Sequence, residues 1–365
     1  MISQYETMVW DIHTAVDMSV DKLIHHPHIQ AAARLIRAKE VVAFPTETVY
    51  GLGADARSSQ AVRKIFEAKG RPQDNPLIVH IASFAMLEGI VDNVSPQARL
   101  LMDRFWPGPL TLVLPKGKEV CQEVTAGLPS VAVRMPDHPV ALALILASQA
   151  PLAAPSANRS GRPSPTRAEH VWQDLAGRIA GLLDGGPTQV GLESTVLDLT
   201  DSEPVLLRPG TITLTELEKV IGPVRLDPSL VAEQGGDEPV RPRSPGQKYT
   251  HYAPEGELYL VSLKKGVEAM RRFIQGKVEE DRKKGERVAV LPPDEGVGFY
   301  EADLVLSLGP REGLDQVASR LYAALRRTDE EKMDKIYAET FSSAEVGLAV
   351  MNRLIKAAGG RVLVP

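Results

Sequence analysis

Apolar residues in the first two thirds of the chain alternate between two spacings. Stretches such as 29–39 and 140–148 repeat them at helical intervals, while short continuous apolar runs are typical of buried strands. The predicted helices are 29–39, 61–68, 95–104, 140–148, 167–175 and 215–221. The predicted strands are 41–45, 77–81, 110–114, 131–134, 152–154, 196–199 and 205–207. This alternation predicts an α/β domain with a mixed sheet, ending near residue 227.

The pattern stops between residues 227 and 256, which are rich in proline, glycine and charge and show no periodicity. We interpret this stretch as a linker. After it, strands are predicted at 258–263, 287–292 and 303–309, and helices at 267–284, 314–326 and 344–358. Strands that alternate with helices predict a small parallel sheet of the Rossmann-like kind.

The expected organisation therefore has four parts. They are an N-terminal extension over 1–28, a larger domain over 29–226, a linker over 227–256 and a smaller domain over 257–365. The extension carries His25, His26 and His28, which we interpret as an irregular, solvated segment rather than a metal site.

Composition narrows the classes of protein. The chain has 365 residues, 43% hydrophobic and 24% charged, which is ordinary for a soluble protein of two domains. The formal net charge of -5 argues against a surface built to bind nucleic acid. A single cysteine, Cys121, excludes an intramolecular disulfide framework and a cysteine-rich zinc site. The longest apolar run, 140–147, is far shorter than the roughly 20 residues that span a bilayer, so we expect a cytoplasmic protein without membrane contact.

The common nucleotide and hydrolase motifs are missing. No G-x-x-x-x-G-K-[ST] loop occurs, and Gly51 and Gly53 are followed by Ala56 where a dinucleotide-binding loop needs a third glycine. No G-x-S-x-G, H-E-x-x-H or EF-hand pattern is present either. Residues outside these common motifs must therefore carry any catalytic or binding function.

Polar side chains instead collect where predicted strands end. Thr46, Glu47 and Thr48 follow the strand 41–45 and are placed to hydrogen-bond a small polar ligand. Taken alone, a capped polar turn explains them equally well. Lys69 and Arg71 lie on a glycine- and proline-rich loop and suit an oxygen-rich anion such as phosphate, although a solvated charged loop is the usual meaning of such a run.

The same theme recurs further along the chain. Arg134 ends an apolar strand and needs an anionic partner if it is buried. A rigid loop over 155–166 carries several hydroxyl and amide groups, residues 193–195 begin a strand, and Arg208 ends another. Open sheets build ligand sites at strand ends, so the repetition predicts one shared site.

Several longer motifs make a family resemblance specific. In order they are PTETVYGLG, K-x-R-P-x-x-N-P-L-I-V-H, WPGPLTLVL, VAVRMPDHP, APSAN-x-SG-x-PSPT, G-x-ESTV-x-D and LLRPG. From about residue 29 onward the chain resembles the YrdC-type family, the L-threonylcarbamoyladenylate synthases. SPGQKYTHYAP at 244–254 and EVGLAVMNRLIKAAGG at 345–360 resemble its long, two-domain form. The resemblance implies a YrdC-like twisted open mixed sheet with helices, followed by a smaller Rossmann-like domain.

The resemblance also implies a reaction. L-threonine, bicarbonate or CO2 and ATP would give threonylcarbamoyl-AMP and pyrophosphate, the first step of t6A modification at position 37 of tRNA. A tRNA threonylcarbamoyltransferase system would take the product, and Mg2+ would accompany ATP, bridging phosphate oxygens without a dedicated protein ligand. No stable nucleic-acid binding is expected.

Residue roles follow from the resemblance. The implied threonine and carbamate residues are Thr46, Thr48, His80, Arg134 and Ser194. The implied ATP residues are Lys69, Arg71, Asn75, Ser130, Ser156, Asn158, Ser164 and Arg208. Lys69, Arg71 and Arg134 would stabilise charge during the reaction, and the planar fork of Arg134 matches the threonine carboxylate.

The linker carries more polar chemistry than a spacer needs. Ser244, Lys248, Tyr249 and His251 are predicted to close over ATP as part of a lid, with a passive tether as the alternative. Two other functions fit the sequence less well. An RNA-binding module is disfavoured by the acidic charge, and a carbamoyltransferase-type maturation protein would carry zinc-finger cysteines that this chain lacks.

Overall fold

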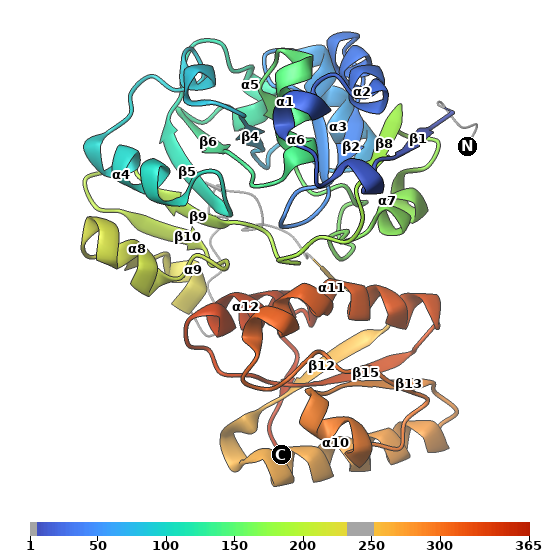
Figure 1. Ribbon diagram of the computed structural model, residues 1–365. Coiled ribbons are helices and arrows are strands. Elements are labelled where there is room, and N and C mark those ends of the chain that lie inside the picture. Colours follow the sequence, from blue (N-terminus) through green and yellow to red (C-terminus); the bar gives the residue numbers. More distant parts are fainter. Residues whose placement is uncertain (1–5, 232–251) are drawn as a thin grey trace. The chain divides into compact units, whose positions relative to one another are not determined.

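The computed structural model describes residues 6–231 and 252–365 (Figure 1). The chain separates into two compact units. Among the described residues, the larger contains 6–160, 164–189 and 193–231, and the smaller contains 161–163, 190–192 and 252–365. Among the helices of the described residues, none is long and apolar enough to cross a membrane.

The larger unit is built on a mixed sheet, as predicted. Its described strands are β1 (Met8–Asp11), β2 (Val42–Phe44), β3 (Gly51–Asp55), β4 (Ile78–His80), β5 (Leu110–Pro115), β6 (Ser130–Arg134), β7 (Leu152–Ala153), β8 (Gly181–Asp184), β9 (Thr195–Asp198), β10 (Val205–Arg208) and β11 (Arg225–Leu226). They lie in the order β1-β8-β2-β3-β7-β4-β6-β5-β9-β10-β11. Both parallel and antiparallel neighbours occur, for example β4 with β6 and β5 with β6.

Helices cover this sheet unevenly. They are α1 (Val20–Leu23), α2 (Pro27–Arg37), α3 (Ser59–Lys69), α4 (Pro96–Phe105), α5 (Gln122–Thr125), α6 (Pro139–Ser148), α7 (Ala168–Leu175), α8 (Leu214–Ile221) and α9 (Pro228–Val231). The main core lies on one face and includes residues from α3, α4, α7 and α8. A second core joins α1, α2 and α6 to side chains on the other face of β2, β7 and β8.

That second face changes character beyond β7. Over β4, β6, β5, β9 and β10 this face carries a small apolar cluster to which only strand residues contribute, including Ile78, Ala132 and Val196. Paired strand residues point to the same face, so His80 and Arg134 share this face with Ile78 and Ala132. We call this part of the sheet the site face.

The sequence analysis misses several strands of the larger unit. It predicts none before residue 29, yet β1 pairs in parallel with β8 and extends the sheet, and residues 13–28 are not the irregular segment expected, because α1 forms there and Leu23 is buried. It also misses β3, whose glycines lack the apolar alternation of a strand. The packing explains them: a Cβ at Gly53 would lie 2.7 Å from the Phe44 ring.

The smaller unit is a parallel sheet, which confirms the Rossmann-like prediction. Its strands are β12 (Glu257–Val261), β13 (Val288–Leu291), β14 (Leu304–Val305), β15 (Lys335–Glu339) and β16 (Val362–Leu363), in the order β14-β13-β15-β12-β16. Its helices are α10 (Val267–Lys283), α11 (Leu314–Glu330) and α12 (Val346–Ala357). Figure 1 shows α11 and α12 on one face of this sheet and α10 on the other. The central strand β15 is missed by the sequence analysis, because Lys335 and Glu339 break its apolar run.

Candidate active site

Lys69 is the last residue of α3 and fastens a distant loop. Ser58 caps the start of the helix, and Gly70, with a φ of 63°, ends it, so the Lys69 side chain leaves from a fixed point. Its Nζ donates to the carbonyl oxygens of Ser156 and Asn158, at 2.5 and 2.6 Å. Ser156 Oγ in turn donates to Asn158 Oδ1 at 2.5 Å. Three residues predicted to bind ATP therefore meet in one cluster, in which Lys69 and Asn158 are buried.

Arg71 and Asn75 lie on the loop that enters β4. Arg71 Nη2 donates to the carbonyl oxygens of Asn75 and Pro76, both at 3.2 Å. Asn75 is fully buried, and neither atom of its side-chain amide finds a hydrogen-bond partner within the described chain. A buried amide without partners is costly, which makes Asn75 a strong candidate to contact a ligand.

Thr46 and Thr48 form a tight turn after β2. Thr46 Oγ1 donates to the Val49 carbonyl at 2.6 Å and lies 2.8 Å from Thr48 Oγ1. Arg134 Nη1 donates to Thr48 Oγ1 at 2.9 Å, and Arg134 Nε donates to the Gly108 carbonyl at 3.2 Å. The turn therefore carries two buried hydroxyls to the guanidinium at the end of β6.

The sequence analysis includes Glu47 among the polar groups that could bind a ligand, but it assigns Glu47 neither to threonine nor to ATP. Its Oε1 lies 2.5 Å from Arg134 Nη2, and the two side chains are 6% and 4% exposed. This is the anionic partner that a buried strand-end arginine requires. In the sequence, the feature that points to Glu47 is its position between two threonines, directly after a predicted buried strand.

His80 lies at the end of β4 on the site face. Its Nδ1 is 3.2 Å from the Ile78 carbonyl, and its ring packs edge-on against Phe44, with the ring centres 6.2 Å apart. Burial, followed by the nearby Arg134 charge, lowers the pKa of His80 from 6.5 to about 3. The imidazole is therefore neutral near pH 7 and acts as a polar group without charge.

The lowered pKa values of His80 and of His138, about 4 in the second case, predict how stability depends on pH. Below pH 6.5 the unfolded chain binds protons on these imidazoles that the folded chain does not. The stabilising contribution is complete above pH 6.5 and is lost as the pH falls toward 3. In urea unfolding between pH 6.5 and 4, His80→Gln should reduce the slope of unfolding free energy against pH by up to about 1.4 kcal/mol per pH unit. Parallel curves for the two proteins would contradict the buried neutral state.

Ser194 and Arg208 meet at the start of β9 and the end of β10. Arg208 Nε donates to the Ser194 carbonyl at 3.0 Å, and its Nη2 donates to Ser194 Oγ at 3.2 Å. Thr111 Oγ1 lies 2.7 Å from Ser194 Oγ. A residue predicted for ATP and one predicted for threonine are thus in direct contact. Thr111, fully buried on the same face, is a further residue that the sequence analysis does not select.

The remaining predicted residues are less central. Ser164 Oγ donates to the Glu193 carboxylate at 2.5 Å, and both residues are buried. Ser130 begins β6 and lines a hollow with Asp198, Thr200 and Asp201, where two carboxylates are poor neighbours for a phosphate. Ser244, Lys248, Tyr249 and His251 lie outside the described residues.

The predicted residues follow strands that run in both directions through the sheet. Thr46 follows β2 and Ser156 follows β7, whereas His80, Arg134 and Arg208 end strands that run in the opposite direction. Strand direction alone therefore does not bring these residues together, because neighbouring strands of a mixed sheet are often antiparallel. The hydrogen bond from Arg134 to Thr48 nevertheless joins the turn after β2 to the end of β6. Strands of three to five residues are only about 10–17 Å long, so a nucleotide-sized ligand on the site face can reach both ends of these strands.

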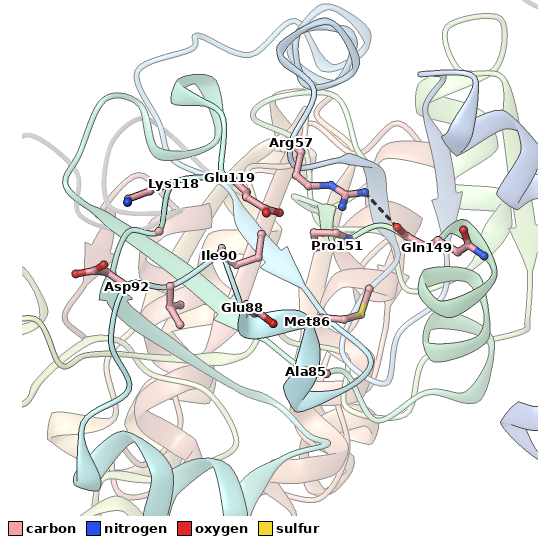
Figure 2. Close-up of a pocket in the computed structure, with 13 residues that line it drawn as sticks. Arg57, Ala85, Met86, Glu88, Ile90, Asp92, Lys118, Glu119, Gln149 and Pro151 are labelled. Carbon is pink, nitrogen blue, oxygen red and sulfur yellow. Dashed lines mark hydrogen bonds between the residues drawn. The ribbon is translucent and has the colours of Figure 1, made fainter.

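Another hollow, of about 570 Å3, lies elsewhere on the larger unit (Figure 2). Arg57, Glu88, Asp92, Lys118 and Glu119 are among the residues that line it. Arg57 donates a hydrogen bond of 3.1 Å to the backbone carbonyl of Gln149, which also lines the hollow. The lining mixes both signs of charge and includes none of the residues predicted for threonine or ATP, so we do not assign the site to it.

Comparisons with known proteins agree on one relationship. The Sua5/YciO/YrdC family profile, described as "Telomere recombination", matches residues 34–210, and a profile described as "Threonylcarbamoyl-AMP synthase, C-terminal domain" matches 212–359. The threonylcarbamoyl-AMP synthase of Bacillus subtilis strain 168 is 55% identical over 349 residues, which cover 95% of this chain and 98% of that protein. The synthase of Pyrococcus abyssi is 49% identical over 346 residues, with 95% and 98% covered. The crystal structure of Pyrococcus abyssi Sua5 complexed with L-threonine has a TM-score of 0.87 and 46% identity, and covers 99% of both chains.

The fold and the site together define a class of protein. Buried cations, hydroxyls and an unpartnered amide around the strand ends of a mixed sheet are typical of an α/β enzyme that binds a small anionic substrate. The two family profiles together match residues 34–210 and 212–359, and they identify which family of α/β enzymes this is. The chain belongs to the Sua5/YciO/YrdC family, in its two-domain threonylcarbamoyl-AMP synthase form.

Proposed function

We propose that this chain joins L-threonine, bicarbonate or CO2 and ATP into threonylcarbamoyl-AMP and pyrophosphate. The observation that carries the proposal is the cluster of Lys69, Ser156 and Asn158 together with the pair of Arg134 and Thr48, all within one unit that has the family's fold. The names of the Bacillus and Pyrococcus relatives, and the threonine in the Pyrococcus complex, support the same reaction.

The chemistry needs no protein nucleophile. The threonine amine loses a proton and forms a bond to the carbon of CO2, giving a carbamate. A carbamate oxygen then attacks the α-phosphorus of ATP, and the bond from that phosphorus to pyrophosphate breaks. The protein must hold the reactants in line, neutralise the charge that collects on phosphate oxygens and keep water from the labile carbamate.

The threonine end is assigned to Arg134 with Thr46, Thr48, His80 and Ser194. Arg134 would receive the substrate carboxylate, and the hydroxyls and the neutral His80 would contact the rest of the amino acid. Burial supports this assignment, because each of these five side chains is at most 4% exposed and a charge-assisted contact is stronger away from water.

The ATP end is assigned to Lys69, Arg71, Asn75 and the Ser156–Asn158 turn, with Ser164 and Arg208 as further members. ATP would enter as its Mg2+ complex. Ser130 remains a weaker member because of the carboxylates beside it. Ser244, Lys248, Tyr249 and His251 stay predicted lid residues. We infer that the enzyme works in the cytoplasm and passes its product to a tRNA-modifying threonylcarbamoyltransferase system.

The test of the proposed reaction is pyrophosphate release under omission. With Mg2+, ATP, threonine and bicarbonate, release should require all of the last three. Serine, which lacks one methyl group, should give a lower rate. Release that continues unchanged without threonine or without bicarbonate would mean that the chain is an ATP pyrophosphohydrolase, and the proposal would fail.

A further inference from the structure

Glu47 is a buried carboxylate that forms one ion pair and accepts no hydrogen bond from the described residues. Its side chain is 6% exposed. The guanidinium of Arg134 is the charge it meets, with 2.5 Å between Oε1 and Nη2. A buried carboxylate in this state depends on its cation, and the cation depends equally on it.

The titratable groups around Glu47 do not replace Arg134. Asp137 and His138, on the loop from β6 to α6, both interact electrostatically with Glu47. Burial, and then the Glu47 charge, raises the pKa of Asp137, while burial lowers the pKa of His138 to about 4. His138 is therefore uncharged near pH 7, and its Nδ1 has no hydrogen-bond partner in the described chain. Among these neighbours, Arg134 alone brings a positive charge.

The described contacts of Arg134 do not use all of its N–H donors. A guanidinium carries five N–H groups. Nε donates to the Gly108 carbonyl, Nη1 donates to Thr48 Oγ1, and Nη2 faces Glu47. Nη2 forms the ion pair without a hydrogen bond in the described chain, so at least one N–H on each terminal nitrogen is available. Two parallel donors on one planar fork are what a carboxylate accepts in a bidentate pair.

We propose that Glu47 is a positioning residue for the amino-acid substrate: by pairing with Nη2 it holds the Arg134 fork so that the two remaining N–H groups receive the threonine carboxylate. The inference rests on the proposed function and adds a residue to it. Gly108 and Thr48 hold the guanidinium at Nε and Nη1, and Glu47 supplies the third point that fixes its plane. Without the carboxylate, Arg134 is a buried cation that must turn toward other oxygens.

The alternatives make different predictions. If Glu47 contacted the threonine ammonium directly, its loss would weaken binding whether or not Arg134 were intact. If its negative charge merely repelled the threonine carboxylate, Glu47→Gln would tighten binding. If it only stabilised the fold, the variant would unfold more easily and would lose threonine and ATP binding alike.

The experiment is a double-mutant cycle with separate KM values. Wild type, Glu47→Gln, Arg134→Lys and the double variant are compared by threonine calorimetry and by steady-state formation of threonylcarbamoyl-AMP. Glu47→Gln should raise the threonine Kd and KM roughly 10–100-fold and leave the KM for ATP within about twofold. The double variant should bind threonine no more weakly than Arg134→Lys alone, because Glu47 acts through Arg134.

Two further variants keep the test decisive. Asp137→Asn is the matched control, since it removes a second carboxylate that interacts electrostatically with the same arginine and should change threonine affinity less than twofold. Glu47→Asp keeps the charge on a shorter stem and should recover part of the affinity, and it carries the test if Glu47→Gln does not fold. Additive losses in the cycle, tighter threonine binding, or equal changes in both KM values would each overturn the inference. A wild-type protein that makes no product would instead refute the proposed function.

Discussion

Replacing Lys69 with methionine should lower kcat/KM for threonylcarbamoyl-AMP formation by roughly 10²–10³-fold, the usual cost of losing one fixed donor to a developing charge. The substitution removes the charge assigned to the phosphates. It also removes the two hydrogen bonds that hold the Ser156 and Asn158 carbonyls. The loss should appear in kcat and in the KM for ATP, while the KM for threonine changes little.

Lys64 provides the matched control for that experiment. It belongs to the same helix, α3, and lies more than one helical turn before Lys69. Its side chain forms an ion pair of 2.7 Å with Glu40 instead of contacting the Ser156–Asn158 turn. Lys64→Met removes the same side chain and should change kcat/KM less than twofold. Equal losses in both variants, or an unchanged Lys69→Met enzyme, would remove Lys69 from the ATP assignment.

Replacing Arg134 with lysine should weaken threonine binding by about 1–3 kcal/mol, or roughly 5–150-fold. Lysine keeps the charge but loses the planar fork, so one ammonium must serve Glu47, Thr48, the Gly108 carbonyl and the substrate carboxylate together. Calorimetry of threonine measures the loss, and calorimetry of ATP should show a smaller change.

Folding must be checked alongside this measurement. Arg134→Lys retains a cation for the buried Glu47, so its thermal unfolding should stay close to that of the wild type, unlike a variant that leaves the carboxylate unpaired. A folded Arg134→Lys protein with wild-type threonine affinity would show that the carboxylate binds elsewhere on the site face.

Local patterns predict the fold where burial is strong. α6 is almost entirely apolar and β5 and β6 are continuous apolar runs, so each is found within about two residues of its predicted bounds. β3 and β15 escape for different reasons. The first uses glycine because Phe44 occupies the space of a side chain, and the second carries charged ends in the centre of a parallel sheet. Both depend on neighbours that are distant in the sequence.

The site residues likewise divide into those that local motifs predict and those that only the fold brings together. Motif resemblance selects Lys69, Ser156 and Asn158, and the structure brings these three together. The sequence analysis does not pair Glu47 with Arg134, because the two residues are 87 positions apart and only the folded chain brings them into contact. Thr111 is missed likewise, since its contact with Ser194 joins two strands that no local pattern pairs.

The central claim, that this chain makes threonylcarbamoyl-AMP, is tested most directly by mass spectrometry of its product. The purified chain is incubated with ATP, Mg2+, threonine and bicarbonate, with 13C in the bicarbonate and 15N in the threonine in parallel reactions. The account predicts a new adenylate whose mass rises by one unit with either label and by two with both, formed together with pyrophosphate. AMP and pyrophosphate without a labelled adenylate, in a protein that binds both threonine and ATP, would contradict it.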